Sequence, residues 1–457
     1  MLRLSIAALV LLSLQTAPTF TERIEHIRTA TNVPAVGGAL FTSRAIEPTV
    51  VTGVRKVGDP TPVTPLDLWH IGSMSKSFTS TLVGRYVERG TLKWTDTLGD
   101  VLGAERARKF APVTLAQILT HRGGLPANPS QADMIAGLQS KDSLPAQRRA
   151  VVDRALAGEP LSAPGAAFLY SNIDYILAGA ILEEKTGTAW EALVRDEVLT
   201  PLNLTSAGLG PPGNTAGITQ PRGHRAQGTE LIPVEPGVFA DNPAFLGPAG
   251  TLHMSIADLA RWGQEHLRGE RGSDGLLKAS TYQRIHTPPS GEADYALGWV
   301  VQTRNGTRVI WHNGSNTMWY AVVAFNAAAD RGVVLVSNGS VNARAAMDAA
   351  AMEIITAPTT SPLPASDVPN GAVFSPDRSH LAYLANGSTP AMSSSVDIHV
   401  RRVRDGADMK VATFDGVVNR LMFSADGAAL VFSTQRAGEA EQRCMVSVSG
   451  REPVQCR

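Results

Sequence analysis

Residues 68–83 read LWHIGSMSKSFTSTLV, and this stretch decides the fold of the chain. From residue 73 to residue 88, apolar side chains recur at steps of about one helical turn: Phe78, Leu82, Val83 and Val87. This spacing predicts a helix, which Gly90 ends. Ser73 and Lys76 stand at its beginning, three residues apart and therefore on one face, so the serine hydroxyl and the lysine amine can touch.

The start of this helix favours chemistry at Ser73. Free N–H groups and the positive end of the helix dipole favour negative charge near the serine. The same field, together with burial, lowers the pKa of Lys76, so a neutral amine can take the serine proton. On its own the Ser-x-x-Lys spacing is a weak signal, because a chain of this length contains about one by composition, usually on an exposed helix turn.

Two further segments accompany the Ser73 motif. The tripeptide YSN (residues 170–172) lies 97 residues after Ser73 and precedes a predicted helix over residues 173–185. The tetrapeptide HNGS (residues 312–315) ends one predicted strand and leads into the next. A lone Tyr-x-Asn at a helix start is usually a capped turn. In the company of the Ser73 motif we interpret it as functional.

These segments resemble the serine β-lactamase and penicillin-binding protein superfamily, and within it the class C-like and esterase (CubicO-type) branch. LWHIGSMSKSFTSTLV resembles the nucleophile segment of that family, and FLYSNIDYILAGAILEEKTG resembles its Tyr-x-Asn segment. ILTHRGGL (residues 118–125) resembles a structural turn, and GPAGTLHMSIADLARW resembles a later helix. The resemblance covers residues 20–356, with the segments in the expected order.

The resemblance implies a serine hydrolase that works through an acyl-enzyme. Ser73 would attack a substrate carbonyl, and Lys76 and Tyr170 would share the proton transfers as general base and general acid. Tyr170 would pass a proton to the leaving group and later help to activate water. Asn172 would hydrogen-bond both the substrate amide and Lys76.

The resemblance also implies that the HNGS segment contacts the substrate. The backbone N–H groups of Ser73 and Ser315, beside Gly314, would form an oxyanion hole worth about 3–4 kcal/mol per donor in comparable hydrolases. His312 would contact the substrate at the place where β-lactamases mostly carry Lys. With an unperturbed pKa of about 6.5, it would be mostly uncharged at neutral pH. We therefore expect neutral esters to exceed β-lactams as substrates, and acidification toward about pH 6 to improve the binding of carboxylate-bearing ligands.

The order of predicted elements indicates a mixed α/β fold. We expect a mostly antiparallel sheet flanked by terminal helices, with a helical lobe inserted after the Ser73 helix. Strands are predicted near both ends of the domain, over residues 33–42, 48–54, 295–301, 308–312, 319–325 and 332–337. Terminal helices are predicted over residues 21–31 and 342–355.

The middle of the domain carries two further signals. A helix is predicted over residues 256–267, with a capping box from Ser255 and Asp258 and with Gly269 as its stop. The Gly- and Pro-rich residues 204–250 lack periodicity, which is typical of a functional wall or lid.

The sequence divides into four parts. Residues 1–17 combine a basic start, an apolar run and small residues, which predicts a signal peptide, with an uncleaved anchor as the alternative. Residues 18–357 form the predicted catalytic domain, 358–369 a Pro-rich linker, and 370–457 a small all-β module. In that module FSPDRSHLAYLA recurs 49 residues later as FSADGAALVFST. The repeat resembles the blades of TolB-type and WD-type propellers, although two copies make only a partial propeller.

The two cysteines, Cys444 and Cys456, flank a pattern of strand, Gly-centred turn and strand. In an exported protein such a pair is plausible as a disulfide, and two free thiols are the alternative. The signal peptide predicts a periplasmic or secreted protein, and no other long apolar segment predicts stable membrane insertion.

Composition narrows the function classes. The 457 residues carry 41 Lys and Arg against 41 Asp and Glu without a basic block, which favours a small-molecule substrate over nucleic acid or a membrane surface. The ten histidines and two cysteines show no metal-ligand spacing, and no cofactor fingerprint is present, so neither metal nor cofactor is expected. The substrate stays open among a short ester, a D-amino-acid peptide and a β-lactam. The alternative is a non-catalytic penicillin- or peptide-binding protein on the same scaffold.

Overall fold

The computed structural model describes residues 18–357, except 229, 290–293 and 305, and a series of segments beyond them. Those segments are residues 369, 372–375, 380–386, 395–402, 407–415, 417–424, 427–435, 440–450 and 453–456. The chain forms two compact units, Met1–Thr356 and Ala357–Arg457. The predicted signal peptide and nearly all of the predicted linker lie outside the described residues. Among the residues that are described, no helix combines the length and apolar character that a membrane span requires.

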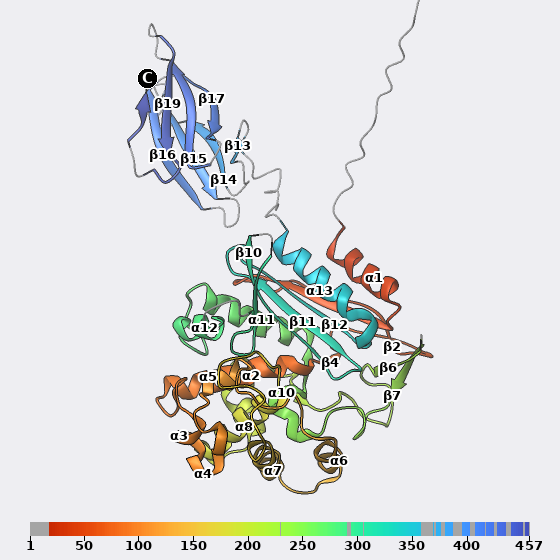
Figure 1. The fold of residues 1–457 in the computed structure, drawn as a ribbon. Helices are drawn as coiled ribbons and strands as arrows, with labels where there is room; N and C mark the ends of the chain where they lie inside the picture. The colour runs from red at the N-terminus through yellow and green to blue at the C-terminus, as the bar shows by residue number, and fades with distance from the viewer. Residues whose placement is uncertain are drawn as a thin grey trace, which may run out of the picture. The chain divides into compact units, whose positions relative to one another are not determined.

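A seven-stranded antiparallel sheet forms the centre of the larger unit (Figure 1), in the order β3-β2-β1-β12-β11-β10-β9. The strands are β1 (Ala35–Phe41), β2 (Val50–Lys56), β3 (Asp59–Pro62), β9 (Val300–Arg304), β10 (Thr307–Ser315), β11 (Tyr320–Asn326) and β12 (Arg331–Ser337). The first and last strands are neighbours, with Val36 opposite Ser337, so both ends of the domain meet in one sheet. The predicted mixed α/β fold is confirmed.

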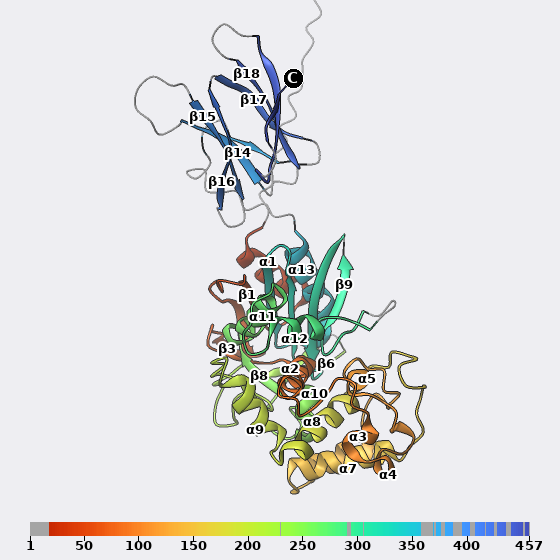
Figure 2. The same cartoon turned by 90° about the vertical axis from the view of Figure 1, so that its left-hand side faces the viewer.

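Helices cover both faces of this sheet (Figures 1 and 2). One face carries α1 (Phe20–Thr31) and α13 (Ser340–Thr356), and the other carries α11 (Ile256–Glu270), with α12 (Ala279–Ile285) packed against it. The side chains of β11 alternate between the two faces, because Val322 belongs to the buried cluster of α1 and α13, and Val323 to that of α11. Every residue of β11 is therefore buried, which explains its continuous apolar sequence.

A helical lobe is inserted between β4 (Leu68–His70) and β8 (Leu252–Ser255), which pair with each other. Its helices are α2 (Ser75–Glu88), α3 (Leu98–Leu102), α4 (Ala104–Ala107), α5 (Leu115–Leu119), α6 (Gln131–Gln139), α7 (Leu144–Leu156), α8 (Asn172–Thr186), α9 (Trp190–Val194) and α10 (Gly247–Gly250). Helices α2 and α8 are buried along most of their length and contact each other at the centre of the lobe. The lobe thus follows the Ser73 segment, as predicted.

Residues 204–250 are more regular than their composition indicates. They contain β5 (Gly208–Leu209), which pairs with β8, and a hairpin of β6 (Gly223–Gln227) and β7 (Glu230–Val234). These strands are only two to five residues long, which is too short for a periodic pattern to reveal them.

Some predicted boundaries are wrong. The strand predicted from residue 295 begins only at Val300, because Gly298 has a φ of +79° and turns the chain before it. Helix α11 continues past Gly269 to Glu270. Its capping box is only half formed, because the Asp258 carboxylate accepts the N–H and hydroxyl of Ser206 instead of reaching back to the start of the helix.

The smaller unit holds two four-stranded antiparallel sheets. One consists of β13 (Val373–Phe374), β14 (His380–Asn386), β15 (Ser395–Arg402) and β16 (Asp408–Asp415), and the other of β17 (Val417–Phe423), β18 (Ala429–Gln435), β19 (Gln442–Ser447) and β20 (Gln455–Cys456). Each copy of the repeat opens one sheet. The Ser375 hydroxyl accepts the N–H of His380, and the Ser424 hydroxyl accepts the N–H of Ala429 at the equivalent place. The sequence repeat is therefore a structural repeat.

Cys444 and Cys456 form a disulfide between paired positions of β19 and β20. Of the two alternatives for the cysteines, the disulfide is confirmed.

Candidate active site

Ser73 lies in a 3₁₀ turn, Gly72–Met74, that leads directly into α2. The helix predicted from residue 73 therefore begins two residues later. Gly72 has a φ of +50°, a conformation that favours glycine, so the chain turns sharply just before Ser73. The Ser75 hydroxyl donates to the carbonyl of Gly72 and accepts the N–H of Leu252, which fixes the turn to β8.

The fully buried Lys76 is surrounded by oxygen atoms. Its Nζ lies 3.1 Å from Oγ of Ser73, 2.7 Å from Oδ1 of Asn172 and 2.8 Å from the carbonyl oxygen of Ala249. The last two oxygens can only accept, so a neutral amine donates its two protons to them. Its lone pair is then left for the proton of the Ser73 hydroxyl.

Burial lowers the pKa of Lys76 to about 7, although the nearby Asp174 opposes this shift. A lysine with an ordinary pKa would be almost fully protonated at neutral pH and unable to act as a base. The structure thus provides a substantial fraction of neutral amine beside Ser73.

Tyr170 contacts both Ser73 and Lys76. Burial raises the pKa of its hydroxyl, and a hydrogen bond with Ser73 partly opposes this shift. The residue as a whole is 37% exposed, and the Lys76 Nζ lies 4.8 Å from the centroid of its ring. Because its pKa is raised, the Tyr170 hydroxyl keeps its proton at neutral pH and can donate it.

Asn172 is the first residue of α8, so the cap of that helix places its side chain near the Ser73 turn. Besides accepting from Lys76, its amide donates to Oδ1 of Asn128 at 2.7 Å. These two contacts orient the amide, and the predicted contact with Lys76 is present.

The end of β10 runs beside the Ser73 turn at van der Waals distance. A Cβ atom at Gly314 would lie 1.9 Å from the carbonyl oxygen of Ile71, and one at Gly72 would lie 2.2 Å from the backbone nitrogen of Ser315. Only glycine fits at either position. The backbone nitrogens of Ser73 and Ser315 therefore come from two adjacent segments, as an oxyanion hole requires.

His312 lines the cavity that opens over Ser73, but only 3% of the residue is exposed. Its Nε2 lies 2.9 Å from the hydroxyl of Tyr295, and its Nδ1 lies 2.5 Å from the carbonyl oxygen of Asn313. Nδ1 therefore donates and Nε2 accepts, which is the neutral tautomer. Burial and the charge of Lys76 lower the pKa of His312 to about 3. The expectation that His312 becomes charged near pH 6 is wrong, because desolvation opposes its protonation.

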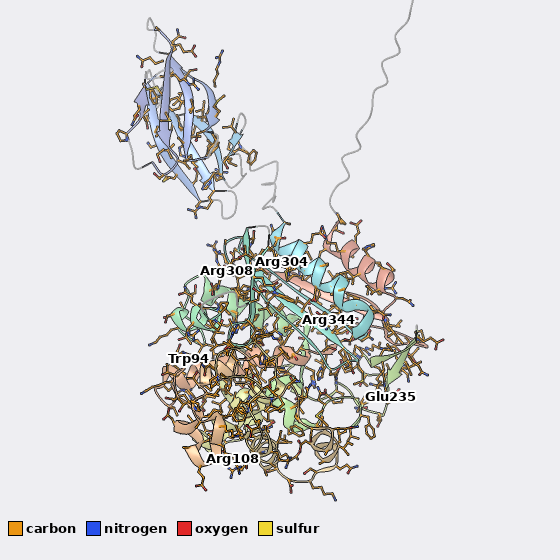
Figure 3. The ribbon with its side chains drawn as sticks, viewed as in Figure 1. Trp94, Arg108, Glu235, Arg304, Arg308 and Arg344 are labelled. Atoms are coloured by element: carbon orange, nitrogen blue, oxygen red, sulfur yellow. A yellow bond between two sulfur atoms is a disulfide. The ribbon has the colours of Figure 1, made fainter. Side chains whose placement is uncertain are left out.

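A cavity of about 580 Å³ opens over Ser73. Tyr170, Tyr295, His312 and Ser315 contribute to its wall. Arg344, exposed on α13, lines it as well (Figure 3). Arg344 brings to the cavity the positive charge that His312 does not supply.

The buried residues His121 and Asp174 lie next to the Tyr170 ring. The His121 ring packs against the Tyr170 ring at a tilt of 47°, with 4.4 Å between ring centroids, and its Nδ1 lies 3.0 Å from Oδ2 of Asp174. Burial raises the pKa of Asp174 well above its usual range and lowers that of His121 well below. The family-like turn at residues 118–125 thus packs against the candidate site.

Tyr295 and Arg344 are among the cavity residues that sequence reasoning missed. Tyr295 was placed at the start of a strand, where an aromatic residue is usually core, and Arg344 was placed on a helix without a motif. No local signal marks either one. Only the tertiary fold brings them to Ser73.

Comparison with known proteins shows the family of the chain. The profile of the beta-lactamase family matches residues 20–357. The chain belongs to the beta-lactamase family. Within it, penicillin-binding protein 4 of Amycolatopsis lactamdurans is 25% identical over 337 residues, which are 70% of this chain and 84% of that protein. Membership, together with relatives named as hydrolases, makes the chain a serine hydrolase.

Solved structures share the fold. The octameric penicillin-binding protein homologue from Pyrococcus abyssi superposes with a TM-score of 0.60 at 19% identity and covers 95% of this chain and 96% of its own. A D-stereospecific amidohydrolase from Streptomyces sp. gives a TM-score of 0.58 at 20% identity, covering 74% of this chain and 99% of its own.

Proposed function

We propose that this serine hydrolase cleaves a small ester or amide through an acyl-enzyme on Ser73. The observation that carries the proposal is the contact of the buried Lys76 amine with the Ser73 hydroxyl at the floor of the cavity. In acylation the neutral amine takes the proton of Oγ, and Oγ bonds to the substrate carbonyl carbon. The carbonyl oxygen then becomes an oxyanion in a tetrahedral intermediate.

Tyr170 completes the proton transfer. When the intermediate collapses, the bond to the leaving group breaks and the Tyr170 hydroxyl donates a proton to it. The ammonium proton of Lys76 then neutralises the Tyr170 phenolate, so that Tyr170 is again a phenol and Lys76 a neutral amine. In deacylation the same groups act in reverse: water gives a proton to the Tyr170 oxygen as the Tyr170 proton passes to the neutral Lys76 amine, and the water oxygen attacks the acyl carbon. Lys76 then returns the proton to Oγ, which leaves as a hydroxyl.

The oxyanion is stabilised by the backbone N–H groups of Ser73 and Ser315. Their segments are held together by the close approach at Gly72 and Gly314. Donors fixed in advance pay no reorganisation cost when charge develops, and each is worth about 3–4 kcal/mol in comparable hydrolases.

Within the family, we assign the chain to the esterase-like members. The uncharged His312 offers a substrate carboxylate no ionic partner at the position where a lysine would stand. Arg344 lines another part of the wall and supports the alternative that a carboxylate-bearing substrate, such as a D-amino-acid peptide, also binds. The D-stereospecific amidohydrolase among the structural neighbours is compatible with that alternative.

We also propose that the protein acts in the periplasm or outside the cell. The disulfide between Cys444 and Cys456 supports this, since such bonds persist mainly in oxidising compartments. Fusing residues 1–30 to a reporter that is active only after export tests it, and an inactive, cytoplasmic reporter contradicts it.

A substrate panel tests the proposed function. We expect the purified chain to turn over p-nitrophenyl butyrate, a D-alanyl dipeptide or nitrocefin, and Ser73→Ala to turn over none of them. A chain that forms a stable acyl adduct without turnover would instead be a penicillin- or peptide-binding protein.

A further inference from the structure

Asp241 is a buried carboxylate outside the cavity of Ser73, and the steps above do not use it. It lies on the segment between β7 and the 3₁₀ turn Ala244–Leu246, and its side chain is 5% exposed. Its carboxylate oxygens accept three hydrogen bonds: from Nε2 of His70 at 2.8 Å, from Nδ2 of Asn316 at 3.1 Å and from the backbone N–H of Asn242 at 2.7 Å.

His70 connects Asp241 to the Ser73 turn. The backbone N–H of Gly72 donates to Nδ1 of His70 at 3.1 Å. A ring nitrogen that accepts carries no proton, so the proton of His70 is on Nε2 and is donated to Asp241. His70 is fully buried, and the residue that it holds, Gly72, directly precedes Ser73.

Asn316 connects Asp241 to the other segment. It follows Ser315, the last residue of β10, and its amide also donates to the carbonyl of Ala240 at 3.2 Å. Its Oδ1 accepts the N–H groups of Met318 and Trp319, which fixes the turn into β11. One carboxylate is therefore hydrogen-bonded to His70, which holds Gly72 beside Ser73, and to Asn316, which follows Ser315.

We infer that Asp241 is a positioning residue for the oxyanion hole, because it ties together the two backbone segments that supply the donors. The inference rests on the proposed function. An oxyanion hole must hold its donors to within about 0.5 Å of the productive geometry. Glycine at positions 72 and 314 allows the two segments to approach, and the bonds through His70 and Asn316 fix their relative position.

The test uses an ester and its thionoester, in which sulfur replaces the carbonyl oxygen. Sulfur is a weaker hydrogen-bond acceptor, so a well-formed oxyanion hole favours the oxygen ester. In Asp241→Asn an N–H₂ group replaces one carboxylate oxygen. This donor then faces the N–H of either Asn316 or His70, so one of the two hydrogen bonds is lost. We expect kcat for the ester to fall by about 10- to 100-fold with KM changed less than about threefold. The ratio of ester to thionoester rates should fall as well.

His70→Asn provides a second variant should Asp241→Asn fold poorly. The oxygen of an asparagine side chain can still accept the N–H of Gly72, but the side chain is too short to reach Asp241. The same fall in the ester to thionoester ratio is expected. Asp142→Asn is the matched control, because Asp142 and Asp241 line one separate cavity of about 600 Å³, and it should leave the ratio unchanged.

The outcomes separate this inference from the proposed function. If the wild-type chain fails to hydrolyse the ester, or Ser73→Ala hydrolyses it equally well, the proposed function is wrong. If the wild type shows the preference for oxygen and folded Asp241→Asn and His70→Asn keep the full ratio, the inference about Asp241 is wrong. If the ester and thionoester rates fall in equal proportion, Asp241 has only a structural role, and the inference is wrong in that case too.

Discussion

The amine of Lys76 lies 3.1 Å from the hydroxyl oxygen of Ser73, and the lysine is completely buried. The 3₁₀ turn that carries Ser73 runs directly into α2, and α2 carries Lys76 into the core beside α8. The burial that lowers the lysine pKa is thus the same feature that keeps the amine beside the serine.

The pH dependence of kcat/KM should follow Lys76. The protonated ammonium is inactive as a base, so activity is lost as pH falls through the pKa of about 7 and is complete above it. We expect kcat/KM for a neutral ester to fall about tenfold per pH unit below that pKa. A flat profile down to about pH 5 would contradict the role of Lys76, since an essential base must titrate.

Removing the Tyr170 hydroxyl should slow turnover without unfolding the chain. Tyr170→Phe keeps the ring that packs on His121 and removes the proton donor. We expect a loss of about 10²- to 10⁴-fold in kcat, the range for general acid–base catalysis. Tyr175→Phe is the control, because its hydroxyl donates to the carbonyl of Leu119 instead. Equal losses in the two variants would show that the Tyr170 hydroxyl has no special role.

Charge in the cavity should decide substrate preference. We expect kcat/KM for p-nitrophenyl butyrate to exceed that for nitrocefin, because His312 carries no charge near neutral pH. Arg344→Gln should lower the nitrocefin value about tenfold and leave the ester value unchanged, whereas Arg304→Gln, on β9, should affect neither. Nitrocefin values far above the ester values would assign the chain to the β-lactamases proper.

A chain ending at Ala357 should stay folded and active. The boundary between the two compact units falls at this point of the sequence, and both cysteines lie beyond it. We expect the truncated chain to keep kcat and KM and to be indifferent to reductant. Truncated protein that is insoluble or inactive, while the full chain is active, would show that the C-terminal module supports catalysis.

The residues that were predicted share a local signal. Ser73 and Lys76 are three positions apart, and Asn172 stands at a helix start, so spacing alone brings each to a defined place. The sheet was predicted because its strands lie near both ends of the domain. The repeat was found because its two copies have the same length and begin with the same Phe-Ser-x-Asp pattern.

The residues that were missed depend on long-range packing. Asp241 lies in a Gly- and Pro-rich stretch, yet it contacts His70 and Asn316 from opposite parts of the chain. The protonation of His312 was misjudged because a sequence shows the residue type but not how deeply it is buried. Sequence therefore predicts the reacting groups better than the groups that hold them.

The role of Ser73 as the nucleophile is tested by finding which residue a covalent serine-hydrolase probe labels. Wild-type chain and Ser73→Ala are treated with a fluorophosphonate probe and digested, and the labelled peptide is sequenced by mass spectrometry. We expect one adduct per chain, on the Ser73 oxygen, and none in Ser73→Ala. An adduct on another residue, or equal labelling of Ser73→Ala, would contradict it.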